Sequence, residues 1–539
     1  MSEPTSPLPS TNRGKRILIS ALEHRAKNEP HSPWMSIPVD AQDLSRGYRD
    51  ITYKEVNNAA NHTAHWLNRN LPKSSEPFQA FAYAGAKDLR YQLLALAAAK
   101  LQKVLVLPSP LVTAEAQLRI LAKKGCTVYL RPASMADHVT AILHGTSHIQ
   151  AIEVPDIEEF FRGDEAEAIT YRKTWDEGKD DPWLVYHTSG TTGNPKPVTY
   201  THYMMAGVDI AASLPGEEES VLHQMANSRW FTPLPSMHYV GMLLSIGMTT
   251  YLNMTAVIGP SGPPTPDIIR DTIRYGRAEA ALLPPALIDA CCLSPTALEA
   301  IRGLKHLLYS GATLSAKSAE LLIPYTKVVS AVGTTEAGGY WTTVPKERDA
   351  WEYLGFPRHL GVTFERRMDD LHELVWVRDD ALPFQQIFKV YPELERFETK
   401  DLWREHPAHK GLWKIIGRLD DYVYLSHADG LHASSLEPEI TAHPSVKSAV
   451  IGGHGRPAPV LLVELNPGTE YGDDHQALIE SLLPYIQRVN ARVHECVHLS
   501  PERVIVATKD KPFVLTVKDS VARLQTLALY EDEIAALFT

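Results

Sequence analysis

Short apolar stretches that run directly into glycine-rich or proline-rich loops recur along this chain, and this recurrence limits its fold more than any other feature. Three of them are AALLPPAL (280–287), KHLLYSGATL (305–314) and KVVSAVGTTEAGG (327–339), and PWLVYH (182–187) leads into a fourth such loop. Continuous apolar runs of this length are typical of strands buried on both faces of a parallel sheet. The functional loops of such sheets lie at the carboxyl ends of the strands.

Predicted helices separate these strands. Residues 51–71 predict a short strand followed by an amphipathic helix, residues 79–85 a buried strand, and residues 88–102 a helix with a largely apolar body. The apolar stripe of the first helix consists of Val56, Ala59, Ala60, Ala64 and Leu67. Strands that alternate with helices predict an α/β fold in which helices flank parallel-rich sheets.

The length of 539 residues requires at least two domains. Residues 1–16 are rich in serine and proline, and we expect them to form a disordered tail. Composition changes near GRLDD (417–421), beyond which shorter strands and short amphipathic helices follow. We therefore predict a large lobe over residues 17–417 and a small α+β lobe over residues 422–539.

Composition excludes several classes of function. A net charge of −11 and a pI near 6.1 argue against nucleic acid or an anionic membrane as the main partner. The uncharged run 239–259 contains Ser, Thr, Asn and Gly, which favours a buried helix–strand pair over a membrane span. The four cysteines have no metal-site spacing, and the adjacent Cys291 and Cys292 suit a reduced, buried element. We expect a cytoplasmic enzyme.

The loop HTSGTTGNPKPVTYTH (187–202) carries the strongest chemical signal. Its glycines permit backbone conformations in which consecutive N–H groups point into one concavity, its hydroxyls add donors, and its lysine adds a positive charge. Composition alone favours a surface turn, but the preceding strand and the lysine favour a polyphosphate site. The residues concerned are Thr188, Ser189, Gly190, Thr191, Thr192, Gly193 and Lys196.

This loop differs from the P-loop of nucleoside triphosphatases. Pro195 occupies the position of the second required glycine, and Pro197 replaces the Ser or Thr that would hold magnesium. Transfer of a γ-phosphoryl group is therefore disfavoured.

Seven segments in order resemble the core motifs of the adenylate-forming superfamily, which includes acyl-CoA ligases, luciferases and adenylation domains of nonribosomal peptide synthetases. They extend over about 335 residues, from the phosphate loop to a lysine near the C-terminus. The segments are TSGTTGNPKP, PLPSMHYVG (233–241), YSGATL (309–314), AVGTTEAGG (331–339), ETKDLW (398–403), GRLDDYVYLSHADGLHASSLEPEI (417–440) and TVKDSVAR (516–523).

The resemblance implies a reaction in two steps. A carboxylate attacks the α-phosphorus of ATP, pyrophosphate leaves, and a thiol then captures the acyl group of the acyl-adenylate. Glu336 is implied as the Mg²⁺ carboxylate, and Lys518 as a mobile catalytic lysine that serves as a compact point charge. Asp401 would accept hydrogen bonds from the ribose hydroxyls, and Arg418 would support ribose or phosphate.

The same resemblance implies further nucleotide contacts and a domain rotation. The small lobe would turn about a hinge at 418–421, with Asp420 as the hinge residue, and Gly430 would line a tunnel for the thiol. The remaining ATP contacts are Ser310, Gly311, Ala312, Val332, Gly333, Thr334 and Thr335.

Three residues depart from the family pattern. Val517 stands where most relatives have glycine, Val332 where many stack an aromatic ring on adenine, and Pro197 where the phosphate motif ends in glycine. These changes could affect loop stiffness or nucleotide affinity, but none removes a charged catalytic group.

The expected substrate is an aryl acid such as a substituted hydroxybenzoate. Amino-acid-activating relatives have an aspartate near the position of Tyr239, and residues 231–244 contain no carboxylate, so an α-ammonium would lack a partner. We also predict that His238 is a catalytic residue. The alternative is that it is an ordinary core histidine. A long fatty acid and a quaternary ammonium acid remain as alternative substrates. The pocket candidates are His238, Tyr239, Val240, Leu243, Leu283, Pro284, Ser310, Gly311, Val332 and Gly333.

The last residues, 517–539, resemble the end of adenylation domains in fungal carboxylic acid reductases. In these proteins a carrier domain with a phosphopantetheine thiol and an NADPH-dependent reductase domain follow, so the chain is expected to be an excised adenylation domain. Two alternatives stay open: a stand-alone CoA ligase, and a non-catalytic nucleotide-binding domain.

Overall fold

The computed structural model describes residues 12–110, 112–188, 195–214, 220–347, 350–368, 370–426, 429–469, 475–515 and 520–538. Packing divides the chain into two units. The first contains residues 1–362 and 377–397, and the second contains residues 363–376 and 398–539. Strands around residues 363–376 and 398–418 therefore belong with the C-terminal part, whereas the sequence suggested a boundary at 418–421.

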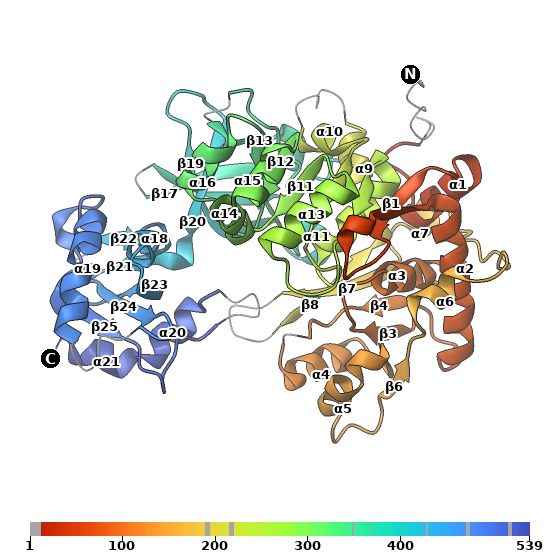
Figure 1. Ribbon diagram of the computed structural model, residues 1–539, viewed down its shortest axis with the longest axis horizontal. Helices are drawn as coiled ribbons and strands as arrows, with labels where there is room; N and C mark the ends of the chain where they lie inside the picture. The colour runs from red at the N-terminus through yellow and green to blue at the C-terminus, as the bar shows by residue number, and fades with distance from the viewer. Residues whose placement is uncertain are drawn as a thin grey trace. The chain divides into compact units, whose positions relative to one another are not determined.

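Two largely parallel sheets form the centre of the first unit (Figure 1). Among the described residues, the seven-stranded sheet has the order β13-β12-β11-β9-β10-β1-β2, and only β2 is known to run antiparallel to its neighbour. Its strands are β1 (Pro33–Pro38), β2 (Tyr48–Thr52), β9 (Arg229–Phe231), β10 (Thr255–Val257), β11 (Ala280–Leu283), β12 (His306–Tyr309) and β13 (Lys327–Ser330).

The six-stranded sheet has the order β6-β5-β3-β4-β7-β8. Its strands are parallel except at the β7–β8 edge, where the chain turns back as a hairpin. They are β3 (Ala80–Tyr83), β4 (Val104–Val106), β5 (Val128–Arg131), β6 (Gln150–Glu153), β7 (Pro182–Thr188) and β8 (Lys196–Thr201). The predicted parallel-rich α/β fold is confirmed.

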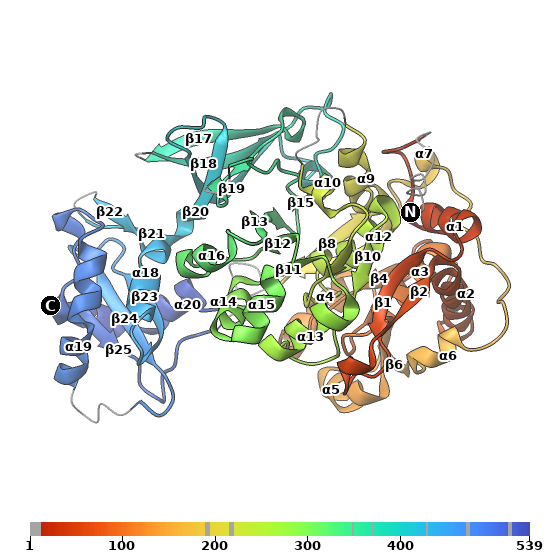
Figure 2. The same cartoon turned by 45° about the horizontal axis from the view of Figure 1, so that its top comes forward.

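Helices cover both sheets. Thr52 and Glu55 form a capping box that starts α2, and the predicted apolar stripe of this helix is buried. Figure 2 shows α14 and α15 beside β11 and β12. The main helices of the unit are α1 (Leu18–Asn28), α2 (Tyr53–Asn70), α3 (Arg90–Lys100), α4 (Ala114–Lys123), α5 (Ala136–Ile142), α6 (Ile157–Phe161), α13 (Pro266–Gly276), α14 (Pro285–Leu293), α15 (Pro295–Arg302) and α16 (Ala316–Leu322).

The other helices of the first unit are shorter. They are α7 (Trp175–Gly178), α8 (His202–Met205), α9 (Gly207–Ala212), α10 (Val221–Met225), α11 (Tyr239–Met242), η3 (Leu243–Gly247), α12 (Met248–Leu252) and α17 (Ile387–Val390). The run 239–259 thus forms a helix followed by strand β10, as predicted. Among the described residues, no helix combines the length and apolarity needed to cross a membrane.

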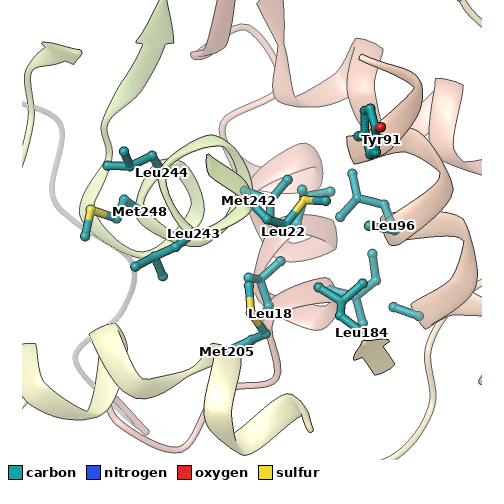
Figure 3. Packing of buried hydrophobic residues seen from close by; sticks show 14 of the residues in the cluster. Leu18, Leu22, Tyr91, Leu96, Leu184, Met205, Met242, Leu243, Leu244 and Met248 are labelled. Atoms are coloured by element: carbon teal, nitrogen blue, oxygen red, sulfur yellow. The ribbon is translucent and has the colours of Figure 1, made fainter. Parts of the chain in front are cut away.

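Side chains from distant segments form the main core of the first unit. In Figure 3, Leu22 of α1 lies between Met242 of α11 and Leu96 of α3, and Leu18 of the same helix lies beside Met205. Burying such side chains stabilises the fold by about 25 cal/mol for each Å² of apolar surface that is removed from water. The predicted N-terminal tail is partly anchored to this body, because the Gly14 N–H donates to Asp209 (2.9 Å) and Arg16 pairs with the same carboxylate. Residues 1–11 lie outside the described part.

The second unit combines a mainly β part with an α+β part. Its strands are β17 (Val362–Met368), β18 (Leu371–Val377), β19 (Arg396–Glu405), β20 (Leu412–Arg418), β21 (Tyr422–Tyr424), β22 (Gly430–His432), β23 (Val446–Gly452), β24 (Val460–Leu465) and β25 (Val504–Val506). Its helices include α18 (Glu437–Thr441), α19 (His475–Asn490), α20 (Arg523–Leu529) and α21 (Glu531–Ala536). The predicted C-terminal α+β domain is confirmed.

Candidate active site

The predicted phosphate loop connects β7 to β8. Thr188 and Lys196 are opposite each other in the antiparallel register, so they mark the two ends of the loop. His187, just before it, is buried and its Nε2 accepts from the Ser109 N–H (2.9 Å). Burial lowers the pKa of His187, which keeps the ring neutral. The predicted contacts Ser189, Gly190, Thr191, Thr192 and Gly193 lie outside the described residues.

Parallel strands bring four other predicted loops to one edge of the seven-stranded sheet. The strands β13, β12, β11 and β9 are neighbours in that order and run parallel. Their carboxyl ends therefore lie along the same edge. Pro284 follows β11, Ser310, Gly311 and Ala312 follow β12, Val332 follows β13, and the segment that leads to His238 follows β9. Sequence reasoning predicted these loops separately, and the strand order places them together.

Glu336 stands on the turn of a tight hairpin. The strands β14 (Gly333–Thr334) and β15 (Gly338–Gly339) pair antiparallel, and Thr334 Oγ1 accepts from the Ala337 N–H (3.0 Å) across the turn. A Cβ atom on Gly333 would lie 2.5 Å from the Gly338 carbonyl oxygen, so the two strands approach as closely as glycine permits. The sequence AVGTTEAGG therefore presents a carboxylate from a compact turn.

Glu336 is the carboxylate for which the sequence predicts a role toward Mg²⁺. Burial is the main cause that raises the pKa of the Tyr200 and Tyr391 hydroxyls, and the charge of Glu336 adds to the effect. Among the described residues, no three His, Cys, Asp or Glu side chains could hold a metal ion by themselves. Mg²⁺ usually takes one or two carboxylates and completes its shell with water and substrate phosphates. A single carboxylate near the predicted phosphate-binding loops fits that preference.

His238 caps the helix that begins the pocket segment. Its carbonyl oxygen accepts from the Met242 N–H (3.2 Å), and its own N–H donates to the Pro235 carbonyl oxygen (3.1 Å). A Cβ on Gly241 would lie 2.3 Å from that same proline oxygen, so only glycine permits this turn. Gln92 supports the segment from α3 by donating to Ser236 Oγ (2.7 Å).

The predicted pocket residues differ in burial. Tyr239 is buried against Tyr200 (ring centroids 4.8 Å apart) and Tyr186 (6.1 Å), and burial raises the pKa of its hydroxyl. Leu243 and Leu283 are fully buried in two different core clusters. Val240 is half-buried. Tyr239 therefore joins the pocket segment to the aromatic side chains of Tyr186 and Tyr200.

Asp401 and Arg418 meet within the second unit. They are register partners on β19 and β20, and Arg418 Nη1 donates to Asp401 Oδ1 and to the Thr399 carbonyl oxygen, both at 3.0 Å. Asp401 is buried, whereas Arg418 is partly exposed. The predicted ribose acceptor and its basic companion thus form one charged pair.

The predicted hinge and thiol loop also belong to this unit. Asp420 lies in the short turn η6 (Leu419–Asp421) directly after β20, and Gly430 begins β22. A Cβ on Gly430 would meet the Tyr422 ring at 2.4 Å, because β21 and β22 are closely paired. Lys518 and Val517 lie outside the described residues.

Sequence reasoning missed two polar residues beside the predicted site. The Tyr200 hydroxyl donates to the Thr335 carbonyl oxygen (2.6 Å), and Gln386 Nε2 donates to the Tyr200 hydroxyl (2.7 Å). Tyr200 lies in the quoted loop segment, and its alternation with Val198 along β8 marked it as buried. Gln386 follows no motif, so only the tertiary structure reveals it.

Two family models match the chain. The AMP-binding enzyme model matches residues 22–363, and the AMP-binding enzyme C-terminal domain model matches residues 420–539. A carboxylic acid reductase of Neurospora crassa is 29% identical over 97% of this chain and 51% of its own length. The isocyanide synthase-NRPS hybrid crmA of Aspergillus fumigatus is 28% identical over 100% of this chain and 34% of its own length. The chain spans about half of the first relative and a third of the second.

Solved structures share the fold. The ATP-bound RpMatB-BxBclM chimera B1 superposes with a TM-score of 0.71 at 19% identity, over 96% of this chain and 99% of that one. The o-succinylbenzoate CoA synthetase MenE from Bacillus subtilis, in complex with ATP and magnesium, gives 0.69 at 16% identity, over 94% and 99%. With its ordered motifs, its fold and both family models in agreement, the chain belongs to the AMP-binding enzyme family, the adenylate-forming enzymes that activate carboxylates with ATP.

Proposed function

We propose that this chain activates an aryl acid, such as a substituted hydroxybenzoate, and passes the acyl group to the phosphopantetheine thiol of a carrier domain as the first step of carboxylic acid reduction. The observation that carries the adenylation step is the convergence of the loops after β9, β11, β12 and β13 on one sheet edge, with Glu336 on the hairpin that follows β13. The likeness to a carboxylic acid reductase over 97% of the chain supports the later steps.

In the first half-reaction, an oxygen of the acid attacks the α-phosphorus of ATP and the bond to pyrophosphate breaks. Catalysis of such a displacement is mainly positioning and charge neutralisation. Thr188 and Lys196 would contact the phosphates from the ends of their loop, and Asp401 with Arg418 would hold the ribose. Magnesium bound at Glu336 would offset charge on the phosphate oxygens. Lys518 would stabilise the charge that develops between acid and phosphate.

In the second half-reaction, the thiol sulfur attacks the acyl carbon and the bond to AMP breaks. The thiol needs the place that Lys518 occupies during adenylation, so the small lobe would rotate about Asp420 between the two steps. Gly430 would line the path of the phosphopantetheine arm. A carrier domain in the same parent chain would supply that arm.

The choice of an aryl acid rests on the pocket segment. Tyr239 stands near the position where amino-acid-activating relatives place an aspartate, and burial raises the pKa of its hydroxyl, so it supplies no negative charge there. Residues 231–244 contain no Asp or Glu, so an α-ammonium would be left unpaired at a cost of several kcal/mol. His238, Val240 and Pro284 are only half-buried and would present a mixed polar and apolar wall to the ring.

The test is acid-dependent exchange of pyrophosphate with ATP in the presence of magnesium. The acids are hydroxylated and methylated benzoates, α-amino acids, fatty acids and betaine, with Lys518→Ala as the control. We expect exchange with benzoates alone and a loss of at least about 100-fold in Lys518→Ala, because removing one group that stabilises transition-state charge costs about 3 kcal/mol. Exchange chiefly with amino acids would refute the substrate assignment.

The acceptor is tested separately with the same acid. Thioester formation on a phosphopantetheinylated carrier domain is compared with formation of the CoA thioester. Faster loading of the carrier supports the proposal, whereas efficient release of the free CoA thioester would make the protein a stand-alone CoA ligase. Binding of ATP without exchange for any acid would leave a non-catalytic nucleotide-binding domain.

A further inference from the structure

We propose that Tyr200 and Gln386 are positioning residues for Glu336, and that their hydrogen-bonded chain holds the turn that presents this carboxylate to magnesium. The inference rests on the proposed function, because the role of Glu336 toward magnesium is part of that proposal. Neither residue belongs to the seven motifs. Their assignment comes from the contacts around the hairpin of β14 and β15.

The chain of hydrogen bonds ends one residue before Glu336. Gln386 Nε2 donates to the Tyr200 hydroxyl (2.7 Å), and that hydroxyl donates to the carbonyl oxygen of Thr335 (2.6 Å). The bonds link three segments that are distant in sequence: strand β8, the residue that precedes helix α17, and the hairpin turn. Within the hairpin, the β14–β15 pairing and the Thr334 contact with Ala337 close the turn, and the hydrogen bonds through Tyr200 add an anchor from outside it at the residue next to Glu336.

Both side chains are held firmly. The Tyr200 ring is fully buried, with the Tyr186 ring edge-on at 5.0 Å and the Tyr239 ring at 4.8 Å. Gln386 is 1% exposed, and its Oε1 is buried without a hydrogen-bond partner among the described residues. A side chain that keeps an unsatisfied buried acceptor in order to donate elsewhere costs stability.

The hairpin of β14 and β15 packs closely against the hydrogen-bonded side chains of Tyr200 and Gln386. Gly338 has φ of +73°, and a Cβ there would lie 2.6 Å from Gln386 Oε1. The turn with Glu336 is therefore anchored at Thr335 by Tyr200, and Gln386 packs against its opposite strand at Gly338.

The charge state of Tyr200 suits this role. Burial and the nearby Tyr239, Tyr186 and Glu336 raise the pKa of Tyr200 well above its ordinary value of 10.0. The hydroxyl consequently stays protonated and keeps donating to Thr335 at every pH at which an enzyme of this kind works. The anchor does not depend on titration.

The experiment compares Tyr200→Phe with a matched control, Tyr53→Phe. Each substitution removes one buried hydroxyl that donates to a backbone carbonyl at 2.6 Å, but Tyr53 bonds Thr249 in α12. The first measurement is the magnesium concentration that half-saturates pyrophosphate exchange. We expect Tyr200→Phe to raise it about 5-fold, the value of one lost hydrogen bond, and Tyr53→Phe to leave it unchanged.

A second measurement does not need activity. Amide hydrogen exchange of residues 333–339 should be faster in Tyr200→Phe than in the wild type, and unchanged in Tyr53→Phe. Gln386→Met should act in the same direction, and the double variant should add little to Tyr200→Phe, because both substitutions break one chain.

The outcomes separate this inference from the proposed function. Absence of exchange activity in the wild type with every acid refutes the proposed function, and the amide measurement still decides whether Tyr200 holds the turn. An active wild type together with an unchanged magnesium requirement in Tyr200→Phe overturns the inference. Unchanged amide exchange at residues 333–339 in Tyr200→Phe overturns it as well.

Discussion

His202 is a buried imidazole that the fold keeps neutral. It is 2% exposed, its ring stacks on Trp183 with centroids 5.0 Å apart, and Tyr171 approaches it edge-on at 5.3 Å. Burial, with a smaller contribution from Lys173, lowers its pKa from 6.5 to about 3. Its Nδ1 has no hydrogen-bond partner among the described residues. The residue therefore resists protonation in the folded state but not in the unfolded state.

This residue makes stability depend on pH. Because the folded pKa is depressed, the contribution of His202 is fully present above pH 6.5 and is lost as the pH falls from 6.5 toward 3. The loss is about 1.4 kcal/mol per pH unit, or about 2 kcal/mol at pH 5. We expect the thermal midpoint of the wild type to fall more between pH 7 and pH 5 than that of His202→Phe. The exposed His31→Gln should follow the wild type, and an identical fall in His202→Phe would contradict the assignment.

At the scale of elements, Arg523 joins three parts of the second unit at the start of α20. It pairs with Glu437 at the start of α18, donates to the Ile451 carbonyl oxygen of β23 (3.0 Å), and lies 3.2 Å from the Asp421 carboxylate of η6. Glu437 also accepts from the Ile451 N–H (2.6 Å), and burial raises its pKa despite the arginine. The largely buried Arg523–Glu437 ion pair therefore links these elements.

Removing one partner of the ion pair should lower the local stability of the elements that it links. Arg523→Met leaves a buried carboxylate without its cation, which costs about 3 kcal/mol, and the double variant with Glu437→Gln should recover part of the loss. Amide exchange of residues 450–452 measures the local stability. The surface control Arg492→Met breaks an exposed pair with Glu439 and should change it by less than about 1 kcal/mol. Equal effects of Arg523→Met and the control would contradict this role.

For the whole molecule, ligand binding should raise stability by mass action. ATP at about 100 times its Kd adds about 2.7 kcal/mol to a protein that binds it only when folded. Adding magnesium to the wild type in the presence of ATP should raise its thermal midpoint by a further increment. Glu336→Gln should lose that increment and keep the effect of ATP alone, whereas the exposed Glu320→Gln should keep both. A full magnesium increment in Glu336→Gln would remove Glu336 from the metal site.

The sequence by itself determined the elements and the family. The stripe around Val56 and the apolar runs at 280–283 and 306–309 are local patterns, and each formed the element that it predicted. The seven ordered motifs identified the family for the same reason, since each motif is contained in one short segment of the chain. Roles of the individual site residues stay predictions.

The tertiary structure decided how these segments meet. Strand order brings the loops after β9, β11, β12 and β13 to one edge, and strand pairing joins Asp401 to Arg418. Tyr239 turned toward Tyr200 and Tyr186, and Gln386 reached Tyr200 from 186 residues away in sequence. Such contacts depend on packing between distant segments, and no local period or motif encodes them, so only the folded chain reveals the anchor beside Glu336.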